Sequence, residues 1–203
     1  MLNPTAARPA RPTGQWLTTD GTRWWFDSGA LALDLAYTGR FDQPERLGST
    51  AELAAWLEER FEEVDGTVSD GDLRDALALR DAIAGAALSA SRGEQPSPAD
   101  VDIVNLYAAI PDIPPSLPGG TRQAGRTRAR AAQALSAIAR EAVALFAIDE
   151  RERIRECDAD DCSFVFYDES RSNNRRWCSM ARCGNRAKVR AHRSKKGKKE
   201  AVA

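Results

Sequence analysis

Four cysteines, all that the 203-residue chain contains, lie within one short stretch. Their spacing is C-x4-C-x15-C-x4-C, formed by Cys157, Cys162, Cys178 and Cys183. Two close pairs joined by a short insert suit a tetrahedral tetrathiolate site, because each pair supplies two sulfurs from one local turn. A closed site of this kind has no open position for water. The sequence therefore predicts one structural Zn2+.

The insert between the two cysteine pairs predicts a β-hairpin. Residues 164–167 are β-prone, residues 168–174 are rich in turn formers, and residues 175–178 would return as the second strand. After Cys178 the sequence is rich in helix formers, so we expect the last ligand in the first turn of a helix. A knuckle, a hairpin and a helix make a treble-clef-like finger, whose thiolates gain from the positive end of the helix dipole.

Two other interpretations of the cysteines remain open. They could be four unrelated buried thiols, although their pairing within one stretch argues against this. They could also form a redox switch, in which oxidised thiolates release zinc. Coordinated structural thiolates are usually protected from oxidation, so we favour the structural site. The formal charge of −2 on a tetrathiolate would be offset by Arg182, Arg186 and Lys188.

Charge is distributed unevenly along the chain. The formal net charge is −1, yet residues 171–203 hold twelve Lys and Arg and a single acid. A segment this basic neutralises several phosphates and releases their counterions, which gives strong, salt-sensitive binding. A solvated tail without a partner is the competing interpretation. We predict nucleic-acid contacts at Arg171, Arg175, Arg176, Arg186, Lys188, Arg190, Arg193, Lys195 and Lys196. Asn173, Asn174 and Arg175 in the predicted turn are the candidates for reading bases.

The remainder of the chain predicts a mainly α N-terminal domain with a small β element. Residues 22–26 favour a strand, and the apolar run that follows to residue 37 fits either a strand or a helix. Helices are expected at 49–61, 70–91, 97–110 and 124–147, from their capping residues and apolar periodicity.

The cysteine stretch resembles the CGNR zinc finger, which is named after a tetrapeptide found here at 183–186. The resemblance includes Arg-Glu-Cys at 155–157, Phe166 to Arg171, and Arg-Trp-Cys at 176–178. In that family the finger follows a mostly helical domain known as ABATE, and the whole is regarded as a stress-induced transcription regulator. The resemblance implies a transcription regulator, and together with the uneven charge it leads us to expect a DNA-binding protein whose helical domain senses a signal or forms a dimer.

The segment after residue 28 also resembles the opening of the ABATE domain. Leu33, Asp34 and Thr38 fit its pattern, while Tyr37 stands where Asn is common. A small-molecule effector could bind near Asp34 or Arg80, although interior ion pairs explain such residues more simply.

These observations predict four segments: a disordered N-terminus (1–15), an ABATE-like helical domain (16–150), a CGNR zinc finger (151–195) and a basic flexible tail (196–203). The sequence has no secretory signal and no apolar run long enough to span a membrane, so we expect a cytoplasmic protein. It lacks the catalytic motifs of hydrolases, kinases and deaminases, so we expect no enzyme. The alternative function is an RNA- or protein-interaction module with a structural zinc finger.

Overall fold

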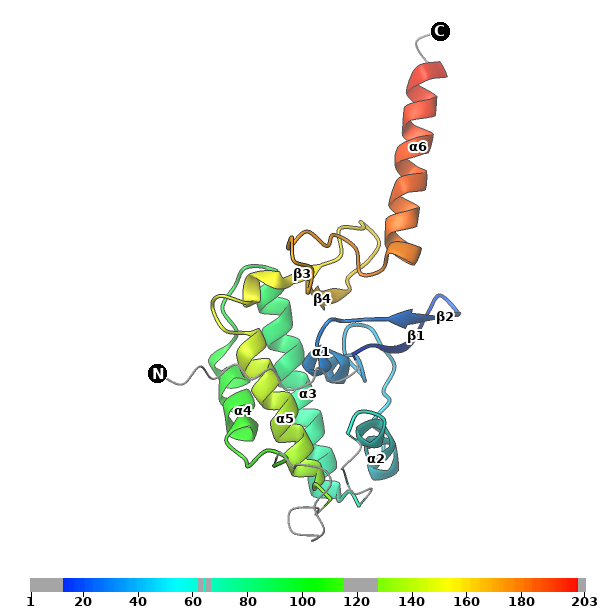
Figure 1. Cartoon of the computed structure of the whole chain (residues 1–203). Helices are drawn as coiled ribbons and strands as arrows, with labels where there is room; N and C mark the ends of the chain where they lie inside the picture. Colours follow the sequence, from blue (N-terminus) through cyan, green and yellow to red (C-terminus); the bar gives the residue numbers. More distant parts are fainter. Residues whose placement is uncertain (1–12, 62–63, 65–66, 115–127, 201–203) are drawn as a thin grey trace, which may run out of the picture.

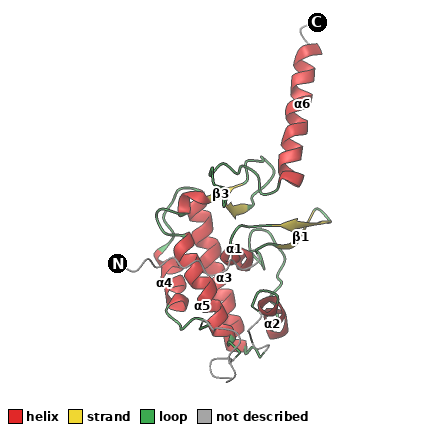
Figure 2. Cartoon of the chain, in the orientation of Figure 1, coloured by secondary structure: helices red, strands yellow, loops and turns green. Residues whose placement is uncertain are grey.

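The structure, a computed structural model, describes residues 13–61, 64, 67–114 and 128–200, and for residues 193–200 it describes the backbone alone. A helical body carries two small sheets, and a long helix extends away from both (Figures 1 and 2). No helix in the described part of the chain is both long and apolar enough to cross a membrane. The elements are β1 (Gln15–Thr19), β2 (Thr22–Phe26), α1 (Leu31–Ala36), α2 (Thr50–Glu58), α3 (Asp70–Ser91), α4 (Pro98–Ala108), α5 (Ala131–Leu145), a 3-10 turn (Arg151–Arg153), β3 (Ile154–Glu156), β4 (Val165–Tyr167), a π turn (Met180–Gly184) and α6 (Asn185–Glu200).

Helices α3, α4 and α5 form the helical body, with α1 and α2 packed beside them (Figure 1). Each of α2, α3 and α4 begins at a serine whose side chain accepts a hydrogen bond from a backbone N–H in the first turn. In α3 the side chain of Asp72 also accepts the backbone N–H of Ser69, which completes a capping box. Alanine, leucine and isoleucine side chains fill the space between the helices.

The predicted helices are present, with shifts at their ends. Helix α3 has the predicted bounds, whereas α2 ends at Glu58 and α4 at Ala108. Helix α5 begins at Ala131, and residues 124–127 of its predicted range lie outside the described part. The apolar run that the sequence left open forms helix α1, and all six of its residues are buried.

Strands β1 and β2 form an antiparallel hairpin, of which sequence analysis found only the second strand. Thr19 pairs with Thr22, so Asp20 and Gly21 form a two-residue loop. Both loop residues have positive φ, 53° and 71°, as a type I′ turn requires. Because Asp-Gly is among the strongest hairpin signals, the sequence did contain the evidence for β1. Residue 15, placed in the predicted disordered segment, begins this strand, while residues 1–12 lie outside the described part.

The strand pairing predicted for the zinc finger is wrong. Strand β4 pairs antiparallel with β3, which precedes the first cysteine, and not with residues 175–178. The returning segment is held by other bonds instead. The Asp168 carboxylate accepts the backbone N–H of Ser170 and of Arg175, and the Arg176 carbonyl accepts the backbone N–H of Asp158. The finger thus still contains a hairpin and a helix, but its hairpin encloses the first cysteine pair.

Finger and helical body share their hydrophobic interior. Leu17, Phe26 and Tyr37 lie in one buried cluster with the zinc-finger residues Phe164 and Phe166 and with three of the cysteines. In the other direction, Ile154 and Val165 of the finger sheet belong to the core of the helical body. Burial of this apolar surface ties the two parts together.

Candidate metal centre and nucleic-acid interface

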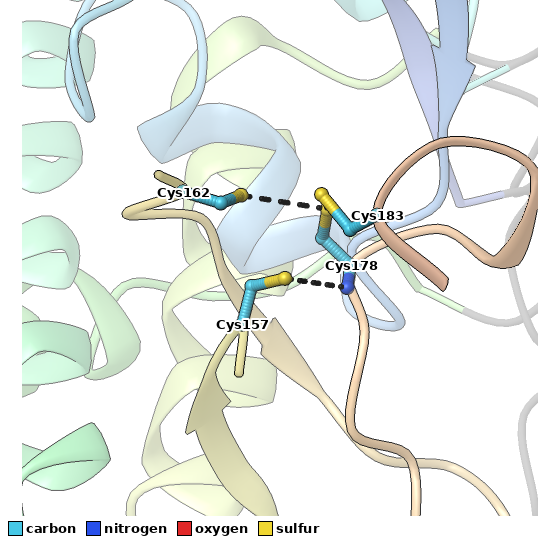
Figure 3. Close-up of side chains that lie close together, drawn as sticks. All are labelled: Cys157, Cys162, Cys178 and Cys183. Carbon is cyan, nitrogen blue, oxygen red and sulfur yellow. Dashed lines mark hydrogen bonds between the residues drawn. The ribbon is translucent and has the colours of Figure 1, made fainter. Parts of the chain in front are cut away.

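The four cysteine sulfurs converge on one point (Figure 3). All four Sγ atoms lie within 4.8 Å of one another, with Cys162 3.7 Å and Cys183 3.5 Å from Cys178. A tetrahedral Zn2+ with Zn–S bonds of about 2.3 Å would place its sulfurs roughly 3.8 Å apart. Cys157, Cys178 and Cys183 are buried and Cys162 is partly buried. The cluster therefore has the ligand type, number and spacing of a zinc site.

Short backbone turns bring the cysteines together. Cys157 follows β3, and Cys162 closes the first knuckle through its N–H bond to the Ala159 carbonyl. The backbone N–H of Cys178 donates to the Cys157 sulfur at 3.4 Å, so the second knuckle is fixed against the first (Figure 3). Cys183 lies in the π turn that runs directly into α6. The last ligand is thus at the start of the helical segment, as the sequence predicts.

The ionisation of the cluster shows why four thiolates need a cation. Hydrogen bonds from the Cys162 and Cys178 thiols lower the pKa of Cys157 well below its usual range. Donation to Cys157 and Cys162 raises the pKa of Cys178. One thiolate is therefore stabilised by neighbours that keep their protons. A divalent cation at the centre removes this restriction and allows all four sulfurs to ionise.

One of the three cations predicted to offset the cluster bonds to it directly. Arg186 donates from Nη2 to the Cys183 sulfur at 3.1 Å, and this hydrogen bond raises the pKa of Arg186. Arg182 pairs with Asp20 of the β1–β2 turn at 2.9 Å. Arg182 Nη1 and Arg186 Nε are buried without a hydrogen-bond partner in the described part of the chain. The buried Nε of Arg186, whose guanidinium already bonds to Cys183, suits the charge that bound zinc would stabilise on the sulfurs. Lys188 is exposed on α6.

Arg175, one of the predicted nucleic-acid contacts, has its guanidinium bonded within the protein. Its Nε donates to the Trp177 carbonyl, and its Nη2 donates to the carbonyls of Cys178 and Asp27. The guanidinium also lies 4.2 Å from the centre of the Phe166 ring. These contacts orient the second knuckle and join it to the residue after β2.

The other predicted basic residues lie on the outside of the finger. Arg171 and Arg176 are exposed in the segment between the two cysteine pairs, and Lys188 and Arg190 are exposed on α6. Arg186 is partly buried at the start of that helix. The side chains of Arg193, Lys195 and Lys196 lie outside the described residues, although the backbone of α6 passes through all three positions.

The two asparagines considered for base reading form part of the turn itself. Asn173 has a positive φ of 45°, and Arg155 donates to both its backbone and side-chain oxygens. The backbone N–H of Asn174 donates to the Ser170 hydroxyl, and the Asn174 side chain is exposed.

Gly184 and Asn185 of the CGNR tetrapeptide serve the fold. A Cβ on Gly184 would lie 2.7 Å from the Met180 sulfur and 3.1 Å from a ring carbon of Trp177. Asn185 donates to the Ala181 carbonyl.

Asp34 and Arg80, considered for an effector site, both have partners within the protein. Arg80 is buried and forms an ion pair at 2.7 Å with Glu45, whose side chain is 47% exposed, so this pair lies at the surface and is not the interior pair that the sequence favoured. Asp34 accepts hydrogen bonds from the Ser28 hydroxyl and the Gly14 N–H, each at 2.7 Å. Burial raises the pKa of Asp34 to about 7, so this carboxyl is partly protonated near neutral pH.

Sequence analysis overlooked three features of the site. Tyr37 joins helix α1 to β4, Asp168 holds the turn before the second knuckle, and the acidic residues 158–161 face the basic ones. The aspartates could have been noticed, because three acids in a four-residue knuckle are unusual beside so basic a helix. The bond of Tyr37 could not be predicted, because its partner Val165 lies 128 residues further along the chain and no local pattern connects the two.

Comparisons with protein families agree with this architecture. Residues 29–149 match the ABATE model, described as "Putative stress-induced transcription regulator", and residues 153–196 match the CGNR zinc finger. A comparison with curated proteins finds no match. Neither matching family is a family of enzymes. Since the first match alone spans more than half of the chain, the protein belongs to the ABATE family of candidate transcription regulators and carries a CGNR zinc finger.

Proposed function

We propose that this protein is a zinc-dependent, DNA-binding transcription regulator that acts in the cytoplasm under stress. The observation that carries the proposal is the position of α6, which begins two residues after the last zinc ligand and extends away from the helical body (Figure 1). Its sixteen residues include eight Lys and Arg and a single acid. A helix of this length is about 24 Å long, enough to lie along a groove of duplex DNA.

Zinc has a specific part in this proposal. Cys183 lies in the π turn that continues into α6, so a metal bound by the four cysteines would fix the start and direction of the helix. The helix is very polar, and its exposed residues contribute little hydrophobic burial to hold it in place. Anchoring by the metal therefore supplies what packing does not, and loss of zinc releases the basic surface from its fixed orientation.

The helical body is proposed to receive a signal or to form a dimer, and to pass its state to the finger through the shared core. An effector or partner that moved α1 would move β4, because Tyr37 and Ser28 bond directly to that strand. A change of this kind needs a differential affinity of the effector for two arrangements of the core.

Selection from sheared genomic DNA tests the proposal. Purified, zinc-loaded protein is incubated with fragments at about physiological salt, and the retained DNA is sequenced. Enrichment of a shared motif supports a sequence-specific regulator, and retention without a motif points to a nonspecific architectural binder. Absence of any retention overturns the proposal. Competition with RNA duplexes in the same assay tests the alternative, because A-form RNA presents different grooves.

A further inference from the structure

The first knuckle carries an acidic loop that faces the basic surface of the finger. This loop, the acidic knuckle, consists of residues 158–161, Asp-Ala-Asp-Asp. Asp161 bonds Arg186 at 3.1 Å and Arg190 at 3.0 Å, and Asp160 bonds Arg190 at 3.4 Å. On the other side of the knuckle, Arg176 donates to Asp158 at 2.7 Å. Three of the arginines proposed to bind DNA are therefore already paired with carboxylates.

These ion pairs lie at the surface and are easily exchanged. The side chain of Asp160 is 95% exposed, and that of Arg190 is 50% exposed. Exposed ion pairs of this kind contribute little to stability, because water and salt screen both charges. Phosphate oxygens accept hydrogen bonds from guanidinium groups in much the same geometry as carboxylate oxygens do. A phosphate can therefore take the place of either aspartate at little cost to the fold.

Arg186 and Arg190 differ in how free they are to change partner. Arg186 also donates to the Cys183 sulfur, so it stays at the metal centre whatever Asp161 does. Arg190 lies one turn further along α6, and among the described residues it bonds to the two aspartates alone. The exchange of partners is thus centred on Arg190.

We propose that the acidic knuckle occupies, in the free protein, the places that DNA backbone phosphates take when DNA binds beside α6. This inference rests on the proposed function and names the contact it uses. Asp160 and Asp161 then compete with every phosphate for Arg190, which weakens the attraction of the basic helix for polyanions in general. Each aspartate that its arginine leaves attracts cations while the DNA gives them up, so fewer cations are released overall and the salt dependence of binding is shallower than the charge of the helix implies.

Neutralising the knuckle tests the inference. The variant Asp160→Asn/Asp161→Asn is compared with the full-length wild type and with Glu58→Gln/Asp102→Asn. That control removes the same two charges from exposed positions on α2 and α4. All three proteins are loaded with zinc, checked for one metal per chain, and titrated against a fluorescent duplex at several salt concentrations.

The knuckle variant is expected to bind about tenfold more tightly at about 0.1 M salt. The slope of log K against log salt should steepen by about one to two, because the neutralised residues no longer take up cations when Arg190 turns to a phosphate. Arg190→Gln should bind more weakly than the wild type. If the wild type binds DNA and the knuckle variant binds no more tightly, or if the control gains as much affinity, the inference is overturned while the proposed function stands. Failure of all the proteins to bind any duplex overturns the proposed function as well. Tighter binding of an RNA duplex than of a DNA duplex would overturn the assignment of these places to DNA phosphates.

Discussion

Removing the hydroxyl of Tyr37 should weaken the joint between the helical body and the zinc finger. This hydroxyl is fully buried, donates to the Val165 carbonyl at 2.8 Å and accepts the Val165 N–H at 2.8 Å. Burial raises its pKa well above the usual value, so the group remains a donor at all physiological pH values. Tyr37→Phe leaves both backbone groups of Val165 without this partner. At roughly 1–3 kcal/mol for each orphaned group, with partial relaxation, we expect a loss of about 3 kcal/mol.

Thermal unfolding of zinc-saturated protein measures this loss. For a chain of this length, about 3 kcal/mol corresponds to a fall in Tm of roughly 6–12 °C. The matched control is Tyr107→Phe, which removes one hydrogen bond to Asp75 at the edge of the helical body and should cost about 1 kcal/mol. Equal shifts in the two variants would refute the reasoning, because the doubly bonded hydroxyl would then contribute no more than the peripheral one.

Three further substitutions have distinct expected outcomes. Cys178→Ser should lower the zinc content below one per chain and abolish DNA binding while far-UV ellipticity shows the helical body retained; normal DNA binding would contradict the role of the metal. The pKa of Asp34 is raised to about 7, so the stabilisation from its protonated form is present in full below pH 4 and is lost as the pH rises to about 7. Across that window, the free energy of unfolding of the wild type should fall by about 4 kcal/mol relative to Asp34→Asn. A parallel pH dependence in both proteins would show that this carboxyl is not the cause. Gly29→Ala should cost more than 2 kcal/mol, because its Cβ would lie 2.4 Å from the Tyr167 carbonyl oxygen, whereas Gly21→Ala, with similar positive φ and open space around it, should cost only about 1–2 kcal/mol in a denaturant titration.

The sequence predicted the local elements of this protein well, for physical reasons. Ser69 and Asp72 form the capping box that begins α3, and Gly93, with a φ of 73°, follows its end. Such caps act within one turn of the chain, so they can be read from neighbouring residues. The cysteine spacing likewise predicted the metal cluster, since each pair closes a local turn.

Contacts between residues far apart in the chain could not be predicted from the sequence. Strand β4 is too short to specify its partner by pattern, and its pairing with β3 is decided by the knuckle between them. The predicted boundary at residue 151 likewise did not foresee that Ile154 would be buried in the helical core. Arg175 shows the same limit for the site. In a segment with many basic residues, the sequence does not show which arginine bonds to carbonyls within the protein and which is exposed.

Zinc dependence of DNA binding is the central claim, and a chelation titration tests it most directly. The anisotropy of a fluorescent duplex bound to the full-length protein is followed while a chelator removes the metal, with zinc occupancy measured in the same samples. We expect binding to fall in proportion to occupancy and to return when zinc is restored, because the metal fixes the start of α6. Metal-free protein that bound the duplex with unchanged affinity would contradict the account.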